Sequence, residues 1–419
     1  MKGVILAAPA SGSGKTTVAA GLVCALCRQG LEVQPYKTGP DYIDAGFLAA
    51  AAGRPCLTLD SWAMRPGTLA AALNGQADIA VVEGAMGLFD GPEGGGGSTA
   101  DLAALTGWPV VLVVDSARQG QSVAALLEGF AGHRSDIRIA GAVLNRVAGA
   151  RHEALLCERA GVVPILAALP LEPALVLPSR HLGLVQAGEH PALEAWLARA
   201  ADLAPAAVMP FGPLRMPLAT EYAPSCPPLP PPGQRIAVAR DEAFTFAYEH
   251  VLAGWRRAGA EFTFFSPLAD EAPEGDAVFL PGGYPELYAG RIAAAANFLA
   301  ALRHHEGPVY GECGGYMVLG EGLEDAAGAR HAMAGLLPLE TSFATPARRL
   351  GYRRLKAKGG SFSPGAVFRG HEFHYARIIR EGPGAPLFEA ADAPGRPLGL
   401  TGLVRGRTAG SFMHLIDTA

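Results

Sequence analysis

One short segment near the start of the chain constrains its fold more than any other. Residues 9–17 read PASGSGKTT, directly after an apolar run at residues 4–7 and before an alanine-rich stretch at residues 18–29. A glycine-rich loop that ends in GKT between a strand and a helix is the P-loop that binds nucleotide phosphates. The first glycine of the usual motif is Pro9 here, so the loop is a variant. An incidental glycine turn is the alternative, and the flanking strand and helix disfavour it.

The residues of this loop have separate expected roles. Backbone N–H groups around Gly12 and Gly14 are expected to surround the phosphates of ATP. We expect Lys15 to bridge β- and γ-phosphate oxygens, and Thr16 to bind Mg²⁺ through its hydroxyl. We also expect Thr17 to belong to the residues of this loop that bind ATP.

Apolar runs alternate with helical segments in the first half of the chain, and the alternation restarts near residue 235. Continuous apolar strands separated by helices are typical of a buried parallel sheet. The expected strands are residues 4–7, 79–82, 110–114, 139–144, 235–239, 261–265, 277–280 and 309–310, and the expected helices are residues 18–29, 121–131 and 244–257.

A proline-dense segment separates these two series. Residues 203–233 hold many prolines, which suit neither a central strand nor a helix interior. We therefore place the domain junction there. The expected parts are a P-loop domain over residues 1–204, a proline-rich linker over residues 205–233 and a second α/β domain over residues 234–419.

Two acidic segments of the first domain suit a Mg·ATP site. They read KTGPDYID at residues 37–44 and VVEGAMGLFDG at residues 81–91, and the second includes a buried strand. Mg²⁺ and its waters are held by carboxylate oxygens. Isolated acids in solvated loops are the alternative, which fits this clustering poorly. The candidates are Asp41, Asp44, Glu83 and Asp90.

The second domain carries a candidate nucleophile. Residues 309–317 read VYGECGGYM, which predicts a strand, a sharp turn with Cys313 at its apex, and a helix. Such a turn exposes the sulfur, and we expect the helix N-terminus to favour the thiolate. A buried structural cysteine is the alternative for a lone Cys, but GECGG disfavours it. LPGGYPE at residues 280–286 follows another strand and resembles the oxyanion loop of class I glutamine amidotransferases, which implies that backbone N–H groups of Gly283 and Gly314 stabilise an oxyanion.

His414, in GSFMHLID at residues 410–417, is the expected base. Many class I glutaminases place a glutamate two residues after this histidine, where the chain has Ile416, so the third member of a triad stays open. HEFH at residues 371–374 is one residue short of HExxH, so a metalloprotease site is excluded. Glu372 or a neighbouring histidine orients the base, contacts substrate or is structural.

Composition and charge exclude other classes of function. The formal net charge is −5 without a block of Lys or Arg, which argues against nucleic acid as a partner. Related partitioning ATPases carry a lysine where this chain has Ala10. No stretch approaches the roughly 18 apolar residues of a membrane span. The six cysteines follow no disulfide pattern, and we expect Cys24 and Cys27 to pack within a helix, so a reducing cytoplasm is expected.

The motifs in their order along the chain resemble a known family. SGSGKTT, KTGPDYID, LDSWAM, VVEGAMGLFDG, LNRV and RHLGLVQAGEH are similar to the corrinoid a,c-diamide synthases, nearly from end to end. APASGSGKT at residues 8–16 and RHLGLVQAGEH at residues 180–190 are most similar to members that use hydrogenobyrinate in the aerobic vitamin B12 pathway. The resemblance implies a dethiobiotin synthetase-like P-loop domain followed by a class I glutamine amidotransferase-like α/β domain.

The resemblance also implies an activity. It is the ATP- and glutamine-dependent amidation of the a- and c-acetate carboxylates of hydrogenobyrinate, through acyl phosphates. Cobyrinate and nickel-sirohydrochlorin are alternative tetrapyrroles, and a P-loop switch ATPase with an inert C-terminal domain is a rival of another class. The expected ligands are the tetrapyrrole, glutamine, ATP as co-substrate and Mg²⁺, and the expected assembly is a homodimer.

Residue roles implied by the resemblance complete the set. Lys15, Thr16 and Glu83 would handle phosphate and metal, and Asp41 would assist both the metal and the chemistry. Asp41, Asp44 and Asp90 would line the space where the carboxylate meets the γ-phosphate. The remaining assignments are Tyr42 and Asp44 as substrate contacts and Asn145 as an adenine contact, for which a turn-forming asparagine is the alternative.

Overall fold

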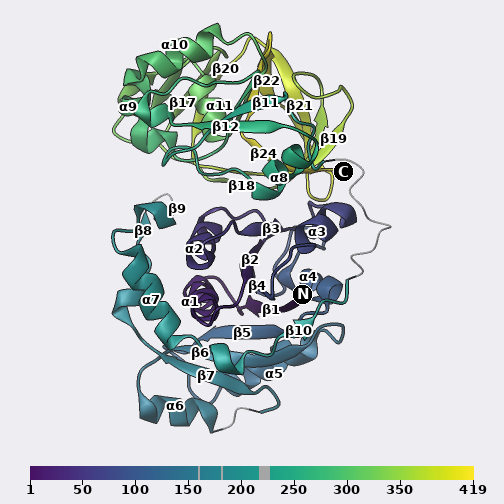
Figure 1. The fold of residues 1–419 in the computed structure, drawn as a ribbon, viewed down its shortest axis with the longest axis vertical. Helices are drawn as coiled ribbons and strands as arrows, with labels where there is room; N and C mark the ends of the chain where they lie inside the picture. Colours follow the sequence, from purple (N-terminus) through teal and green to yellow (C-terminus); the bar gives the residue numbers. More distant parts are fainter. Residues whose placement is uncertain (159–160, 181–182, 217–226) are drawn as a thin grey trace. The chain divides into compact units, whose positions relative to one another are not determined.

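The computed structural model describes residues 1–158, 161–180, 183–216 and 227–419 (Figure 1). Its contacts divide the chain into two compact units. The first is Met1–Trp62 with Leu69–Ala223, and the second is Ala63–Thr68 with Pro224–Ala419. Residues 217–226 of the expected linker lie outside the described residues, and the domain bounds expected from the sequence stay a prediction.

The first unit is built on one parallel sheet in the order β3-β2-β4-β1-β5-β6-β7. Its strands are β1 (Lys2–Ala7), β2 (Val33–Thr38), β3 (Leu57–Leu59), β4 (Ile79–Glu83), β5 (Val110–Asp115), β6 (Ile139–Val147) and β7 (Ile165–Pro170), and β10 (Gly212–Pro213) pairs antiparallel with β1. The predicted apolar runs lie in β1, β4, β5 and β6. Near-continuous apolar strands arise because both faces of the sheet are covered.

Helices cover the two faces of this sheet. Figure 1 shows α1 (Lys15–Arg28) and α2 (Ile43–Ala52) on one side, and α4 (Thr99–Thr106) and α5 (Val123–His133) on the other. Val4 and Leu6 of β1 pack in one apolar core with residues of α1, α2 and α7. The other helices are α3 (Pro66–Leu73), α6 (Ala150–Cys157), α7 (Leu193–Leu203) and the short η1 (Pro173–Leu175), η2 (Ala187–Glu189) and η3 (Ala206–Val208), and β8 (Ser179–Arg180) pairs with β9 (Gly183–Leu184).

The strand order brings three loops of the first unit together. β2, β4 and β1 are neighbours in the parallel sheet, so their carboxyl ends lie at one edge. The P-loop follows β1, the KTGPDYID segment includes the end of β2, and Glu83 ends β4. Ligand sites in open parallel sheets form at such an edge, where the strand order changes direction.

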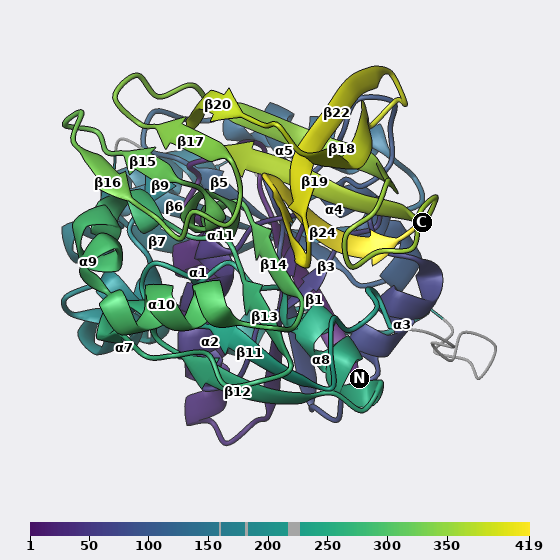
Figure 2. The ribbon, with the colours of Figure 1, turned by 90° about the horizontal axis from the view of Figure 1, so that it is seen from above.

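The second unit contains a ten-stranded mixed sheet in the order β12-β11-β13-β14-β23-β22-β21-β18-β19-β24. Its strands are β11 (Arg235–Ala239), β12 (Glu261–Phe265), β13 (Ala277–Leu280), β14 (Val309–Glu312), β18 (Arg349–Ala357), β19 (Val367–His374), β21 (Ala385–Asp392), β22 (Pro397–Arg405), β23 (Thr408–Ser411) and β24 (Met413–Thr418). Figure 2 shows parallel strands β11–β14 on one side and the antiparallel strands on the other. The parallel strands were expected, and the antiparallel part was not.

A smaller sheet and short helices complete the second unit. The sheet has the order β16-β15-β17-β20, with β15 (Gly322–Glu324), β16 (Arg330–Ala332), β17 (Leu339–Ser342) and β20 (Arg377–Glu381). The helices are α8 (Glu249–Arg257), α9 (Ala289–Ala294), α10 (Ala296–His304), α11 (Gly314–Leu319), η5 (Pro267–Ala269) and η6 (Pro285–Tyr288). In the part of the chain that the structure describes, no helix has the length and apolar character to cross a membrane.

Candidate active sites

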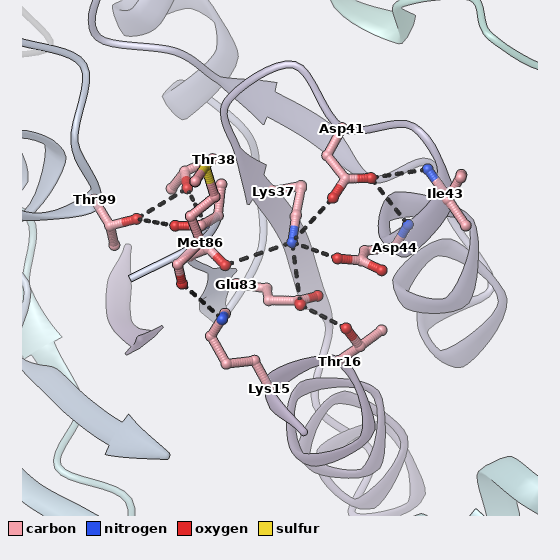
Figure 3. A network of polar contacts seen from close by, with 12 residues as sticks. Lys15, Thr16, Lys37, Thr38, Asp41, Ile43, Asp44, Glu83, Met86 and Thr99 are labelled. Carbon is pink, nitrogen blue, oxygen red and sulfur yellow. Dashed lines mark hydrogen bonds and ion pairs between the residues drawn. The ribbon is translucent and has the colours of Figure 1, made fainter. Parts of the chain in front are cut away.

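A buried lysine is the centre of the polar cluster in the first unit (Figure 3). Lys37, near the end of β2, is 1% exposed. Its Nζ lies 2.7 Å from Asp44 Oδ2, 3.1 Å from Glu83 Oε1 and 3.5 Å from Asp41 Oδ2. Three predicted site residues therefore meet at one cation. Sequence reasoning missed Lys37, although a lysine at the end of a buried strand was a usable signal.

The carboxylates of this cluster are held in unequal protonation states. Burial is the largest cause that raises the pKa of Glu83 to about 7 and that of Asp41 to about 6. Repulsion from Asp44 is a further cause in both. Burial is the largest influence on Asp44 and opposes its ionisation, but the charge of Lys37 and the hydrogen bonds with Asp41 and Lys37 together lower the pKa of Asp44. The buried Glu83 and the partly exposed Asp41 and Asp44 share one lysine here, so an added divalent cation would be attracted to the cluster.

Thr16 and Glu83 fit a Mg²⁺ site. Thr16 Oγ1 donates to Glu83 Oε1 at 2.8 Å, and the buried Glu83 Oε2 has no hydrogen-bond partner in the described structure. An orphaned buried carboxylate oxygen beside a P-loop hydroxyl suits a cation that takes its other ligands from phosphates and water. Within the described ranges, no group of three or more His, Cys, Asp or Glu side chains forms a metal cage. Asp41 Oδ1 instead accepts from the N–H groups of Ile43 and Asp44.

Two residues near the end of β6 donate hydrogen bonds to the backbone of the P-loop. Asn145 Nδ2 donates to Ser13 O at 2.9 Å, and Arg146 Nη1 donates to Gly12 O at 2.9 Å. Gly14 has φ +87°, and a Cβ there would lie 2.2 Å from Asn145 Nδ2, so only glycine fits. Asn145 therefore stabilises the P-loop, and its contact with adenine stays a prediction.

The loop after β4 meets the P-loop lysine. Lys15 Nζ donates to Met86 O at 2.7 Å, and Met86 has a left-handed backbone with φ 50°. Burial first, and then the charge of Lys37, lowers the pKa of Lys15. The exposed Asp90 closes the same loop, because its Oδ2 accepts from Gly87 N at 2.8 Å.

The last two predicted residues of this site lie at helix starts. Thr17 is the third residue of α1, after Lys15 and Thr16, and Tyr42 directly precedes α2. The Asp44 carboxylate is bound by Lys37, so any substrate contact of Asp44 competes with this ion pair.

Replacing Lys37 with methionine is expected to destabilise the first unit by about 3–5 kcal/mol, because the buried Glu83 and the partly exposed Asp41 and Asp44 lose their common counter-charge. Lys2→Met, at an exposed position of β1, is the matched control. Urea unfolding followed by circular dichroism measures the difference. Equal midpoints for the two variants would contradict a structural charge at Lys37.

The candidate nucleophile lies on a strained turn between β14 and α11. Cys313 has φ 47° and ψ −102°, a conformation that costs about 1–3 kcal/mol for a residue other than glycine. Its N–H donates to Ser411 O at 2.8 Å, and Met317 N donates to its carbonyl at 3.1 Å. The surrounding hydrogen bonds therefore hold the side chain at the apex of the turn, but Cys313 is buried, so the exposed sulfur expected from the sequence is wrong.

The predicted oxyanion loop lies beside this turn. A Cβ at Gly314 would be 3.0 Å from Gly283 N, so the two expected donors belong to adjacent backbone segments. A Cβ at Gly282 would be 2.4 Å from His414 Cε1, which places the imidazole against the same loop. The arrangement brings the predicted base and the predicted oxyanion donors to one loop next to Cys313.

At rest the pair is a thiol and a neutral imidazole. Burial first, and then the charge of Glu286, raises the pKa of Cys313, whose Sγ donates to Phe373 O at 3.6 Å. Burial first, and then the charge of His374, lowers the pKa of His414 to about 3. The expected resting thiolate is therefore wrong, because a six-residue helix offsets too little of the burial cost. A neutral His414 is instead able to accept the thiol proton.

The HEFH segment lies on strand β19 and not on a helix. Glu372 is bound by Arg353, at 2.6 Å from Nη2 and 2.9 Å from Nε, and its Oε1 is 3.0 Å from His374 Nε2. The ring of His371 stacks on that of His414 with centroids 4.7 Å apart. His371 thus contacts the base, whereas Glu372 is engaged with Arg353 and His374.

A carboxylate that sequence reasoning missed faces the base. Glu312 Oε2 lies 3.9 Å from His414 Nδ1, and both side chains are buried. The signal was present, since Glu312 directly precedes Cys313, but its partner lies on another strand.

Comparisons with known proteins cover both units. The model of the CobQ/CobB/MinD/ParA nucleotide binding domain matches residues 4–184, and that of the CobB/CobQ-like glutamine amidotransferase domain matches residues 235–418. The chain is 54% identical to a hydrogenobyrinate a,c-diamide synthase of Rhizobium meliloti (strain 1021) over 434 residues, which cover 100% of this chain and 99% of the relative. It is 53% identical to that of Brucella suis biovar 1 (strain 1330) and 50% identical to that of Mesorhizobium japonicum, with the same coverage. The two-part α/β fold expected from the sequence is confirmed.

Proposed function

The chain belongs to the family of the hydrogenobyrinate a,c-diamide synthases, and from this premise we propose that it amidates the a- and c-acetate carboxylates of hydrogenobyrinate in cobalamin biosynthesis. It is a glutamine-hydrolysing carbon–nitrogen ligase that uses ATP. Each amide consumes one ATP and one glutamine, so the diamide consumes two of each.

The P-loop unit activates the carboxylate. A carboxylate oxygen of the substrate attacks the γ-phosphorus of ATP, ADP leaves, and an acyl phosphate forms; phosphate is then a good leaving group. Lys15 stabilises the charge on the transferred phosphoryl group. Lys37 keeps the carboxylate of Asp44 ionised. Mg²⁺, held by Thr16 and Glu83 with Asp41 nearby, supplies further positive charge when bound.

The amidotransferase unit supplies ammonia. His414 takes the proton of the Cys313 thiol as Sγ attacks the amide carbon of glutamine. Backbone N–H groups near Gly283 and Gly314 stabilise the oxyanion, and His414 returns the proton to the leaving ammonia. Water then hydrolyses the thioester to glutamate. The free ammonia attacks the acyl carbon of the acyl phosphate, and phosphate departs.

One observation carries this proposal: a single chain contains both a P-loop with an acidic cluster and a strained Cys313 beside a neutral His414. Product analysis tests it. Purified protein is given hydrogenobyrinate, Mg·ATP and glutamine, and mass spectrometry is expected to show two successive replacements of OH by NH₂. Cobyrinate and nickel-sirohydrochlorin serve as parallel substrates, and absence of any amide with all three rings would overturn the proposal.

The assembly and location follow from the sequence alone and stay proposals. We infer a cytoplasmic homodimer with neither nucleic acid nor membrane as a partner. Size-exclusion chromatography with light scattering checks the dimer. The rival switch ATPase with an inert C-terminal unit predicts no glutamine hydrolysis, so a glutaminase assay separates the two functions.

Asp90→Asn is expected to reduce acyl phosphate formation by about 10²-fold while ATP binding persists. Asparagine can still accept the hydrogen bond from Gly87 N, so the turn survives and only the charge is lost. Trapping the acyl phosphate with hydroxylamine measures the step, and Glu93→Gln, in the same loop, is the control. Normal turnover of the Asp90 variant would make Asp90 a turn former only.

A further inference from the structure

We propose that Glu312 positions His414 for proton transfer, through a contact of its carboxylate with Nδ1 that replaces the glutamate missing at position 416. This inference rests on the proposed glutaminase activity. It assigns the third member of the triad, which the sequence left open because Ile416 occupies the usual place.

Glu312 is held in a fixed orientation toward the base. It is the last residue of β14, directly before the nucleophile, and it is 3% exposed. Its Oε1 accepts from Tyr310 Oη at 3.1 Å and from Leu415 N at 3.2 Å. These two donors occupy one oxygen, and the other, Oε2, lies 3.9 Å from His414 Nδ1.

Other acids near the base are bound elsewhere. Glu372 accepts from Arg353 and His374, as described above. Asp417, which follows Ile416, accepts from the backbone N–H and the Nε of Arg65. The carbonyl of Ile416 itself lies 2.8 Å from His250 Nε2. Glu286 is also buried and acts on Cys313 by its charge, whereas the Oε2 of Glu312 lies at the Nδ1 edge of His414.

The distance of 3.9 Å is longer than a direct hydrogen bond. Catalytic hydrogen bonds are often long without substrate and shorten when the reacting complex forms. A cavity of about 20 Å³ adjoins Glu312 and is lined by Tyr248, Tyr310 and Leu415. One water fits this volume, so the Glu312 carboxylate has space beside it in which to change its orientation.

A carboxylate next to Nδ1 favours the tautomer of His414 that can act as a base at Nε2. Neutral imidazole carries its proton on one of two nitrogens, and an acceptor at Nδ1 keeps the proton there. Nε2 then has a free lone pair for the thiol proton, and the carboxylate stabilises the imidazolium that follows. Burial raises the pKa of Glu312 to about 8, so its ionised form is populated as pH rises through this value.

Glu312→Gln tests the assignment, because glutamine keeps the shape and removes the acceptor charge. We expect kcat for glutamine hydrolysis to fall by about 10²-fold or more with KM little changed. Amidation supported by ammonium salt is expected to continue. Glu381→Gln is the matched control, since Glu381 also accepts from a tyrosine hydroxyl, Tyr316 Oη at 2.7 Å, and its side chain is exposed.

The pH profile separates positioning from packing. Titratable groups near Glu312 are Tyr310 on its own strand, the adjacent Cys313, whose pKa is raised by burial and also by the charge of Glu312, and His414 on β24, and Tyr248 before α8 lines the same cavity. Wild-type kcat is expected to rise through about pH 8 as Glu312 ionises, and this rise is expected to vanish in Glu312→Gln. Glu312→Asp retains a carboxylate, so it is expected to keep the rise and recover part of kcat.

The outcomes distinguish this inference from the proposed function. Wild-type protein that fails to hydrolyse glutamine would overturn the glutaminase itself. An active wild type with a Glu312→Gln variant of equal kcat and equal pH profile would overturn the inference alone. If circular dichroism shows that Glu312→Gln does not fold, Glu312→Asp is used in its place. A folded aspartate variant whose kcat does not rise with pH would overturn the assignment.

Discussion

Replacing Cys313 with serine is expected to abolish glutamine-dependent amidation while ammonia-dependent amidation continues. Glutamine hydrolysis is expected to fall by about 10³-fold or more, since serine at this position lacks the more nucleophilic sulfur. The thiol is protonated at rest in this site, because burial raises the pKa of Cys313. A hydroxyl holds its proton more strongly still, so His414 would activate it poorly.

The separation of the two activities is the informative part. The P-loop belongs to the other compact unit and keeps its residues in the Cys313 variant. Ammonium salt at a pH that provides free NH₃ is therefore expected to restore both amides, measured by mass spectrometry. Cys157→Ser, at an exposed position, is the control. Loss of both activities in a folded variant would give Cys313 a part in the synthetase step, and retained glutaminase activity would exclude it as the nucleophile.

Replacing Lys15 with alanine is expected to reduce amidation by about 10³-fold with either nitrogen source. The ammonium group is 2.7 Å from Met86 O and close to the acidic cluster, and we expect it to bind the γ-phosphate there. Its loss removes the charge that stabilises phosphoryl transfer. No other side chain of the P-loop sequence carries a positive charge.

Several readouts locate the Lys15 defect. Formation of ADP with hydrogenobyrinate present is expected to fall in parallel with the amide, because both depend on the same transfer. Lys2→Ala changes an exposed lysine of the preceding strand and is expected to behave as wild type. Near-normal amidation by a folded Lys15→Ala protein would remove the phosphate assignment.

Much of the fold and of both sites followed from local sequence. The P-loop and the GECGG turn are contiguous motifs, in which a strand, a tight turn and a helix are encoded by neighbouring residues. β11, β12 and β13 have the bounds that the apolar runs predicted. The antiparallel strands after residue 348 were not predicted, because alternating patterns on partly exposed strands are weaker signals than continuous apolar runs.

The sequence by itself determined that a nucleotide-binding domain and a glutamine amidotransferase domain belong to one chain, and it predicted which residues bind phosphate and which attacks glutamine. Only the tertiary structure decided which charges meet. Lys37 became a central residue because β2 and β4 are neighbours in the sheet, although Glu83 is far away in sequence. Glu312 reaches Leu415 and His414 across 103 and 102 residues, because β23 pairs with β14 and β24 begins directly after β23. Burial, which also depends on the whole fold, then decided that Cys313 rests as a thiol and His414 as a neutral base.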